Sequence, residues 1–295
     1  MKSLPATLFP ALLRLTGRLP LWLLRSLGSA AGYYNYGCRT RMAAVTRRNI
    51  ERCFPDRTRA QQRQLEKTSL RETGRLAGEI LAIWTRDSSW TYNRIVGVQG
   101  LDTAKDYLAR GKGLIVLAPH LGNWEVLGIY LSTLGQVTNL YEPPKRQEFE
   151  DLVRTSREKA GAKLVPTNNR GVAALLQALK RGELTGILPD QTPNLAGGTF
   201  SEFFGQPTFT MTLVHKLIER TGCSAVYGYA KRVDGGFEII FRPAESAIYS
   251  DDEQESVRAL NLGIEACVRD VPEQYQWEYK RFKRQPAGVN FYQGI

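Results

Sequence analysis

The chain has 295 residues, enough to bury a full hydrophobic core in one large domain or two modest ones. Its 42% hydrophobic and 23% charged residues exclude an intrinsically disordered protein. The formal net charge of +11 predicts an anionic partner, such as nucleic acid, an anionic membrane surface or an acidic protein, although a solubilising surface would carry the same charge.

Four cysteines are scattered along the chain without the spacing of a metal or redox site, which predicts reduced thiols and a cytoplasmic environment. They are Cys38, Cys53, Cys223 and Cys267.

Residues 1–34 predict a helix that lies on a membrane. The segment from Leu4 to Tyr34 is rich in Leu, Trp and Ala, and Pro20 should break or kink it. Arg14, Arg18 and Arg25 share one helical face, opposite a face of leucines. A spanning helix would place these arginines in hydrocarbon at roughly 2.5–3.5 kcal/mol each, and no signal-peptide cleavage site follows. We therefore expect an interfacial amphipathic helix with its arginines toward lipid phosphates; packing on the protein's own core is the alternative.

Residues 35–90 predict a helical lead-in. A basic helix over 39–53 ends at Phe54-Pro55-Asp56, and a long amphipathic helix follows over 59–84. The basic stretch has no interleaved aromatic platform, so it does not resemble a nucleic-acid reader.

From residue 91 onward, short apolar runs alternate with helical segments. This alternation predicts an α/β core over 91–295, with a mostly parallel or mixed central sheet of about seven strands flanked by helices. Together with the lead-in it forms one domain, 35–295. The last two strands, joined by residues 233–236, should form an antiparallel hairpin at one edge. The expected strands are 95–98, 114–118, 137–141, 164–166, 185–188, 225–230 and 237–241, and the expected helices are 101–110, 122–134, 148–160, 170–181, 210–220 and 254–270.

The longest irregular stretch is predicted between Pro189 and Phe209, and loops of this length are usually functional or disordered. It begins with Asp190 and Gln191 directly after a strand, at the sheet edge where ligands bind. Its four phenylalanines could cover an apolar ligand, or pack beneath the loop as a small core of their own.

His120 follows the apolar run 113–118 and precedes a helical segment in which Glu125 stands. A histidine at this position can take or give a proton at neutral pH, and a nearby carboxylate can orient its ring. The sequence offers no Gly-x-Ser-x-Gly elbow, Ser-x-x-Lys or adjacent cysteine, so the attacking oxygen would belong to the substrate. Metal binding is the competing use, but a catalytic zinc needs at least three protein ligands and no second clustered histidine is present.

The segment 119–125, Pro-His-Leu-Gly-Asn-Trp-Glu, is similar to the His-x4-Glu/Asp motif of the lysophospholipid acyltransferase superfamily. Its extended form resembles the bacterial lipid A biosynthesis acyltransferases. Further blocks in the family's order are Arg48-Asn49-Ile50, Cys53-Phe54-Pro55, Arg170-Gly171, Asp190-Gln191, Phe203-Phe204-Gly205 and the run Gln276–Phe282.

The resemblance implies a glycerolipid-acyltransferase-like fold and acyl transfer from an acyl-carrier protein to a hydroxyl of a lipid A precursor, at the cytoplasmic face of the inner membrane. It implies His120 as general base and Glu125 as its catalytic partner. Arg170, Asp190 and Gln191 would contribute to substrate binding. Backbone amides near Gly122 and Asn123 would stabilise the oxyanion.

Because the thioester supplies an activated carbonyl, we expect no metal or other cofactor, and no nucleic-acid partner; we expect a monomer. An acyltransferase that uses acyl-CoA or another glycolipid or phospholipid acceptor is the nearest alternative. A non-catalytic protein that binds anionic membranes or nucleic acid is the alternative from another class.

Overall fold

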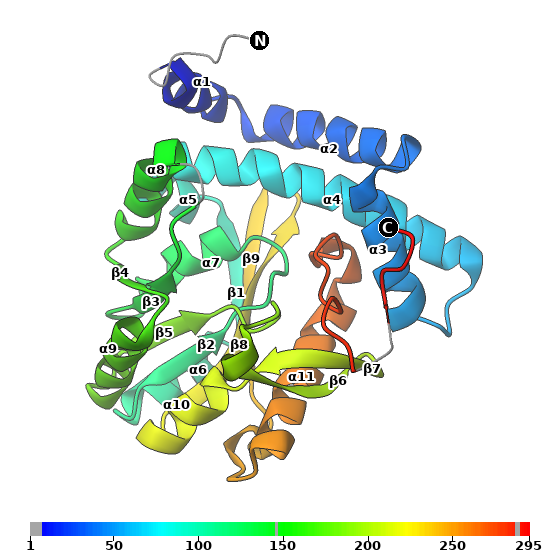
Figure 1. Cartoon of the computed structure of the whole chain (residues 1–295). Helices are drawn as coiled ribbons and strands as arrows, with labels where there is room; N and C mark the ends of the chain where they lie inside the picture. The colour runs from blue at the N-terminus through cyan, green and yellow to red at the C-terminus, as the bar shows by residue number, and fades with distance from the viewer. Residues whose placement is uncertain (1–7, 145–146, 287–289) are drawn as a thin grey trace.

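The computed structural model describes residues 8–144, 147–286 and 290–295 (Figure 1). The chain begins with α1 (Leu8–Gly17) and α2 (Leu21–Gly37), and the break between them falls at Pro20, as predicted. The first residues of the expected amphipathic segment, 4–7, lie outside the described residues. Next come α3 (Arg41–Cys53) and α4 (Arg59–Thr85), where the sequence predicts helices. A capping box between Thr58 and Gln61 starts α4 by satisfying the first free N–H groups of the helix.

Helix α2 lies along α4 on the side away from the central sheet, and the two run in opposite directions (Figure 1). Glycines make this contact unusually close. A Cβ at Gly28 would lie 2.1 Å from the carbonyl oxygen of Gly74, and one at Gly74 would lie 1.9 Å from the carbonyl oxygen of Gly28. One turn further along α2, a Cβ at Gly32 would lie 2.2 Å from the carbonyl oxygen of Leu70. The two backbones therefore touch, as in small-residue helix pairs.

The expectation that Arg25 faces lipid phosphates is wrong. Its guanidinium points inward: Nε donates to Glu79 Oε1 at 2.7 Å, and Nη1 and Nη2 donate to the carbonyl oxygens of Val233 and Gly236 at 2.9 Å each. A buried carboxylate on α4 thus takes the place predicted for a lipid phosphate. Arg14 and Arg18 are exposed. Within the described part of the chain, no helix combines the length and the apolar character needed to cross a membrane.

The central sheet has five strands in the order β1-β9-β8-β2-β5. They are β1 (Ile95–Gln99), β2 (Leu114–Leu117), β5 (Leu184–Ile187), β8 (Ser224–Val233) and β9 (Gly236–Pro243). All neighbours are parallel except the β8–β9 hairpin. The hairpin was expected at an edge of the sheet, but β1 pairs outside β9, so the edges are β1 and β5.

A single sheet of about seven strands is not confirmed. Strands β3 (Thr138–Tyr141) and β4 (Lys163–Pro166) form where expected, but as a separate parallel pair. A single bridge, Val137 to Leu184, joins this pair to the edge of β5. Beyond this bridge, the backbone N–H of Gly186 on β5 donates to the side-chain oxygen of Asn139. In a continued ladder this N–H would donate to a backbone carbonyl of the neighbouring strand. The ladder therefore stops after one bridge.

The stretch predicted to be irregular, 189–209, contains an antiparallel hairpin of β6 (Gly198–Phe203) and β7 (Gln206–Met211). Phe203, Phe204 and Phe209 are buried. The rings of Phe203 and Phe204 meet edge to face, 4.9 Å apart. These phenylalanines are thus largely core residues, which was the alternative reading of the sequence.

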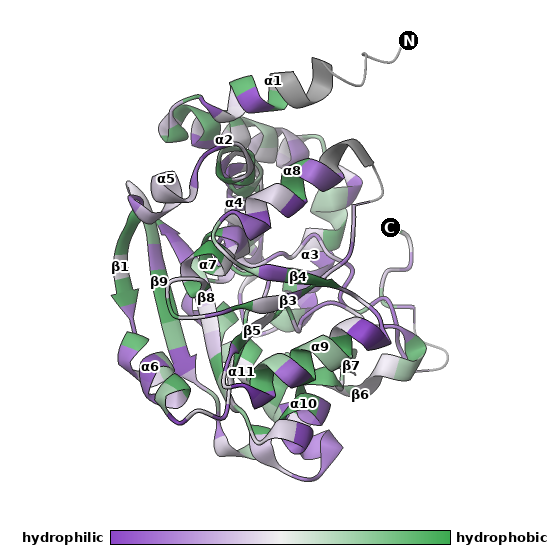
Figure 2. Cartoon of the chain, turned by 90° about the vertical axis from the view of Figure 1, so that its left-hand side faces the viewer, coloured by the Kyte–Doolittle hydropathy of each residue, from purple (hydrophilic) through white to green (hydrophobic). Residues whose placement is uncertain are grey.

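Helices cover both faces of the sheet, and β2 shows how its residues divide between them. Ile115 and Leu117 pack toward α9 (Asn169–Lys180), α10 (Leu213–Thr221) and α11 (Glu253–Asp270). Leu114 and Val116 pack toward α7 (Trp124–Leu131) and α6 (Leu101–Ala109). On that second side also lie α5 (Ser88–Tyr92) and α8 (Gln147–Glu158). Figure 2 shows hydrophobic and hydrophilic residues on different sides of these helices, as expected for helices that cover a sheet.

Candidate active site

The register of two neighbouring strands brings His120 and Asp190 together. Leu117 at the end of β2 pairs with Ile187 at the end of β5. The pairing continues for one residue, because the backbone N–H of Ala118 donates to the carbonyl of Ile187. His120 and Asp190 each lie three residues beyond their paired strand ends. Parallel strands of this kind place functional residues at their carboxyl ends.

Asp190 binds His120 through both carboxylate oxygens. Oδ1 lies 2.8 Å from Nδ1 of the ring, and Oδ2 accepts the backbone N–H of His120 at 2.9 Å. Burial raises the pKa of the Asp190 carboxyl, but the charge of the His120 ring and these hydrogen bonds outweigh it and hold the pKa below its ordinary value. An ionised Asp190 can only accept, so Nδ1 carries the proton of this hydrogen bond, and in the neutral ring Nε2 is the nitrogen with the lone pair.

Gln191 lies at that free nitrogen. Its amide nitrogen is 3.1 Å from His120 Nε2 and 3.4 Å from Gln276 Oε1. The edge of Trp124 meets the histidine ring, with the ring centres 4.8 Å apart. His120 is 9% exposed. The ring is thus held on one side by a carboxylate, and its other nitrogen meets a neutral amide that a ligand could replace.

The predicted contact between Glu125 and the His120 ring does not form. Glu125 lies in the first turn of α7, and both of its carboxylate oxygens bind Arg157 on α8, at 2.6 to 3.2 Å. The reason is the path of the backbone before the helix. Leu121 and Gly122 form bridges to Tyr275 and Ala230, so these two residues are held outside the helix and α7 starts only at Trp124.

Gly122 and Asn123 form the tight turn before α7. Gly122 has φ +63°, and a Cβ there would lie 2.0 Å from the carbonyl oxygen of Ala230, so only glycine fits. Their backbone N–H groups, expected near an oxyanion, already donate to the carbonyls of Gln274 and Ala230 at 3.0 and 2.8 Å. The next two N–H groups, of residues 124 and 125, have no acceptor in the described part of the chain.

Arg170 is apart from these residues. It stands in the first turn of α9, is exposed, and its backbone N–H donates to the side chain of Asn168. Its guanidinium has no hydrogen bond or ion pair within the described residues. Those residues also contain no group of three His, Cys, Asp or Glu side chains arranged as metal ligands.

The C-terminal segment 274–282 closes the site from a part of the sequence far from His120. The backbone N–H of Gln276 donates to the carbonyl of His120 at 3.0 Å, and the hydroxyl of Tyr279 accepts the N–H of Thr192. The Glu278 carboxyl is also close by, and burial raises its pKa. The motif 276–282 marks this segment in the sequence, but nothing in the sequence indicates which of its atoms reach His120.

Comparisons with known proteins show which family the chain is similar to. Residues 5–284 match the family described as bacterial lipid A biosynthesis acyltransferase. The chain is 26% identical over 278 residues to the lipid A biosynthesis palmitoleoyltransferase of Escherichia coli, covering 92% of this chain and 88% of that protein. It is 27% identical over 285 residues to a lipid A biosynthesis acyltransferase of Haemophilus influenzae, covering 95% and 84%. It is 24% identical over 279 residues to the lipid A biosynthesis lauroyltransferase of Escherichia coli, covering 92% and 89%.

A match over nearly the whole chain includes the strand ends, the turn before α7 and the C-terminal segment. This protein therefore belongs to the bacterial lipid A biosynthesis acyltransferase family and is an acyltransferase of lipopolysaccharide biosynthesis.

Proposed function

We propose that this protein moves a fatty acyl chain from the thioester of an acyl-carrier protein to a hydroxyl of a lipid A precursor, at the cytoplasmic face of the inner membrane. The observation that carries the proposal is the set of contacts made by the two nitrogens of the His120 ring. Asp190 takes Nδ1, and Nε2 is the remaining ring nitrogen, which lies at hydrogen-bond distance from the neutral amide of Gln191. A base so oriented suits the removal of a proton from a hydroxyl.

In the proposed reaction, the acceptor hydroxyl replaces the Gln191 amide at Nε2 of His120. Nε2 takes the hydroxyl proton as the oxygen attacks the thioester carbonyl carbon, and a C–O bond forms. Asp190 stabilises the imidazolium that results. When the tetrahedral intermediate collapses, the C–S bond breaks and the leaving thiolate takes the proton from His120. The acyl chain is transferred directly, without a covalent enzyme intermediate.

Stabilisation of the oxyanion is assigned to the start of α7. The N–H groups of residues 124 and 125 have no acceptor in the described part of the chain, and a helix start favours negative charge. Glu125 remains a proposed site residue, but it acts by holding Arg157 near this helix start rather than by orienting the ring. Arg170 is assigned to the outer part of the substrate site, because it is exposed.

The charge of the chain supports an acidic donor protein and an anionic acceptor. The net charge is +11, and arginines are concentrated on α3 and at the start of α4. Such a surface raises the rate of association with an acidic carrier protein. The alternative donor, acyl-CoA, would use the same thioester chemistry.

Attachment to the membrane is assigned to the outer face of α1 and α2. On α2, Trp22 is 67% exposed and Leu27 is 55% exposed. Other large apolar side chains exposed on α1 and α2 are Leu15, Tyr33 and Tyr34. Aromatic and aliphatic side chains next to exposed arginines suit the interface of an anionic bilayer.

The test of the reaction is His120→Ala, assayed with purified protein, acyl-carrier-protein and acyl-CoA donors, and a lipid A precursor. Removal of the general base should lower turnover about 10²–10⁴-fold while the folded fraction is unchanged. Near-normal turnover of a folded His120→Ala protein would overturn the proposal. If the protein prefers acyl-CoA, the assignment of His120 as the base still holds, but the acyl donor is acyl-CoA rather than the acyl-carrier protein.

The membrane assignment is tested with vesicles of phosphatidylglycerol and phosphatidylethanolamine. Trp22→Glu should reduce the fraction of protein that sediments with them. Leu262→Glu is the matched control, because Leu262 is 51% exposed and its helix, α11, lies away from α2 (Figure 1). Equal binding by the two variants would contradict the assignment.

A further inference from the structure

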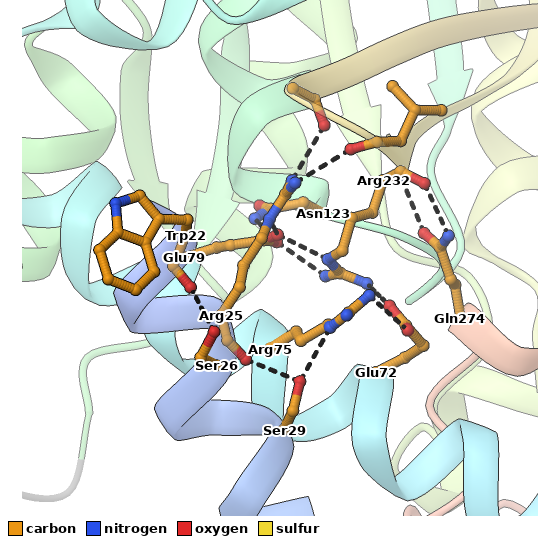
Figure 3. A network of polar contacts seen from close by, with 12 residues as sticks. Trp22, Arg25, Ser26, Ser29, Glu72, Arg75, Glu79, Asn123, Arg232 and Gln274 are labelled. Carbon is orange, nitrogen blue, oxygen red and sulfur yellow. Dashed lines mark hydrogen bonds and ion pairs between the residues drawn. The ribbon is translucent and has the colours of Figure 1, made fainter. Parts of the chain in front are cut away.

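The turn that carries His120 is attached to a buried ion cluster (Figure 3). At its centre is Glu79 on α4, whose side chain is fully buried. Its Oε1 accepts from Arg25 Nε at 2.7 Å and from Arg232 Nε at 2.6 Å. Its Oε2 accepts from Arg232 Nη2 at 2.7 Å and from the amide of Asn123 at 3.0 Å. Residues from three parts of the sequence thus meet at the Glu79 carboxylate, and one of them, Asn123, is three residues after His120.

Glu79 fixes which way the Asn123 amide points. Because the carboxylate accepts from Nδ2, the oxygen Oδ1 must face the other way, where it accepts the N–H of Val126 at 3.2 Å. That second bond is the N-terminal cap of α7. An amide turned the other way would present its NH2 group to a backbone N–H and lose the cap.

A second connection holds the same turn through Gln274. The side chain of Gln274 accepts the backbone N–H of Arg232 at 2.8 Å and donates to the carbonyl of Arg232 at 2.9 Å. The backbone carbonyl of Gln274 accepts the N–H of Gly122. Gly122 and Asn123 are therefore both tied to the cluster around Arg232.

Buried ion pairs contribute little net stability, because desolvation offsets their attraction. A cluster that joins a cap residue to two other helices is better suited to fixing geometry. We propose that Glu79 and Arg25 are positioning residues: through Asn123 they set the start of α7 and, with it, the orientation of His120. The proposal rests on the proposed role of His120 as the base. It also makes the seating of α2 on α4 a condition for catalysis, because α2 supplies Arg25.

The primary test compares Glu79→Gln with Glu66→Gln. Glu66 is a matched control on the same helix: it is 1% exposed and is also paired with an arginine, Arg47, at 2.9 Å, but within the described residues no hydrogen bond or ion pair joins it to the turn. Glu79→Gln should lower kcat about 10–100-fold, as loss of an outer-shell contact does elsewhere. KM should change less than about threefold in both variants, and kcat of Glu66→Gln should stay within about threefold of the parent.

A readout independent of activity is amide hydrogen exchange. Residues 119–127 should exchange faster in Glu79→Gln than in Glu66→Gln when the two are compared at equal distance below their melting temperatures. Arg25→Ala should reproduce the faster exchange and the lower kcat. Arg25→Lys keeps a positive charge beside Glu79, so its exchange rate and its kcat should lie between those of Arg25→Ala and those of the parent.

Asn123→Ser covers the case in which Glu79→Gln does not fold. Serine keeps a cap oxygen for α7 but is too short to reach Glu79, and all ion pairs of the cluster remain. It should show the same lowered kcat and faster exchange of 119–127.

Equal kcat and equal exchange in Glu79→Gln and Glu66→Gln, or a normal Asn123→Ser protein, would overturn the inference. These outcomes are distinct from failure of the proposed function. If His120→Ala is inactive while Glu79→Gln behaves like its control, only the positioning role fails. If His120→Ala is active, the base assignment fails, and hydrogen exchange still reports whether the cluster holds the turn.

Discussion

Two buried charge clusters are attached to the same short turn, residues 120–123, and they differ in completeness. In the cluster around Glu72 and Glu79, every carboxylate oxygen accepts from an arginine, and one also accepts from Asn123. In the His120–Asp190 pair, the hydrogen-bond partner of one ring nitrogen within the described residues is a neutral amide. The complete cluster can hold the chain in place, whereas the incomplete one can accept a ligand. Chemistry is therefore expected at the incomplete cluster and geometric control at the complete one.

The largest effect is expected from Asp190→Asn. An asparagine can present its NH2 group to Nδ1, which would favour the wrong ring tautomer and remove the stabilisation of the imidazolium. Turnover should fall about 10²–10⁴-fold with little change in the melting temperature. Steady-state kinetics and a thermal melt of the same sample check this. A large loss of stability with normal turnover would reverse the roles assigned to the two clusters.

Arg232→Met should affect stability more than any substitution in the His120–Asp190 pair. It leaves Glu72 and Glu79 buried with part of their charge unpaired, which costs about 3–5 kcal/mol of the free energy of unfolding. Urea denaturation followed by fluorescence measures it, with His120→Ala as the comparison. An Arg232→Met protein as stable as the parent would show that the complete cluster does not hold the fold together.

A smaller effect is expected where Glu125 meets Arg157, a pair that is partly open to solvent, since the Arg157 side chain is 35% exposed. In a double-mutant cycle of Glu125→Gln and Arg157→Gln, the coupling free energy should be about 1 kcal/mol. The coupling free energy in a double-mutant cycle of Glu125→Gln with His120→Ala should be smaller. Strong coupling to His120 instead would restore the sequence-based pairing of these two residues.

The smallest effect concerns pH. The pKa of Asp190 in the folded protein lies below its ordinary value of 3.8. Its contribution to stability is therefore fully present above pH 3.8 and is lost as the pH falls through the folded pKa. Melting temperatures recorded from neutral pH to below 3.8 should fall less steeply for Asp190→Asn than for the parent. Identical slopes would mean that the pair adds no charge-dependent stability.

The sequence predicted the position of His120 well, because a buried strand followed by a glycine turn and a helix is a local pattern. It also contained the information for Asp190. Both residues lie three positions beyond strand ends, and parallel neighbours bring such positions together. The structure places Asp190 against the His120 ring, whereas the sequence-based prediction assigned Asp190 to substrate binding.

The partner of Glu125 could not be predicted from the spacing of five residues. That spacing allows a contact with His120 if the helix begins early, and the start of α7 is delayed by bridges to residues 230 and 275. The inward turn of Arg25 depends in the same way on Glu79, fifty-four positions later. Contacts of this range leave no periodic signal. The central sheet has fewer strands than predicted for a local reason, since the side chain of Asn139 occupies the edge of β5.

The glycine contact between α2 and α4 has a consequence for hybrid enzymes. Where Gly28 and Gly74 meet, backbone touches backbone, and no side chain is present that could change its rotamer to accommodate a different partner. An α2 from a relative with a larger residue at the position of Gly28 would therefore be held away from α4. Chimeras between members of this family should therefore exchange α2 and α4 together, as one inherited unit.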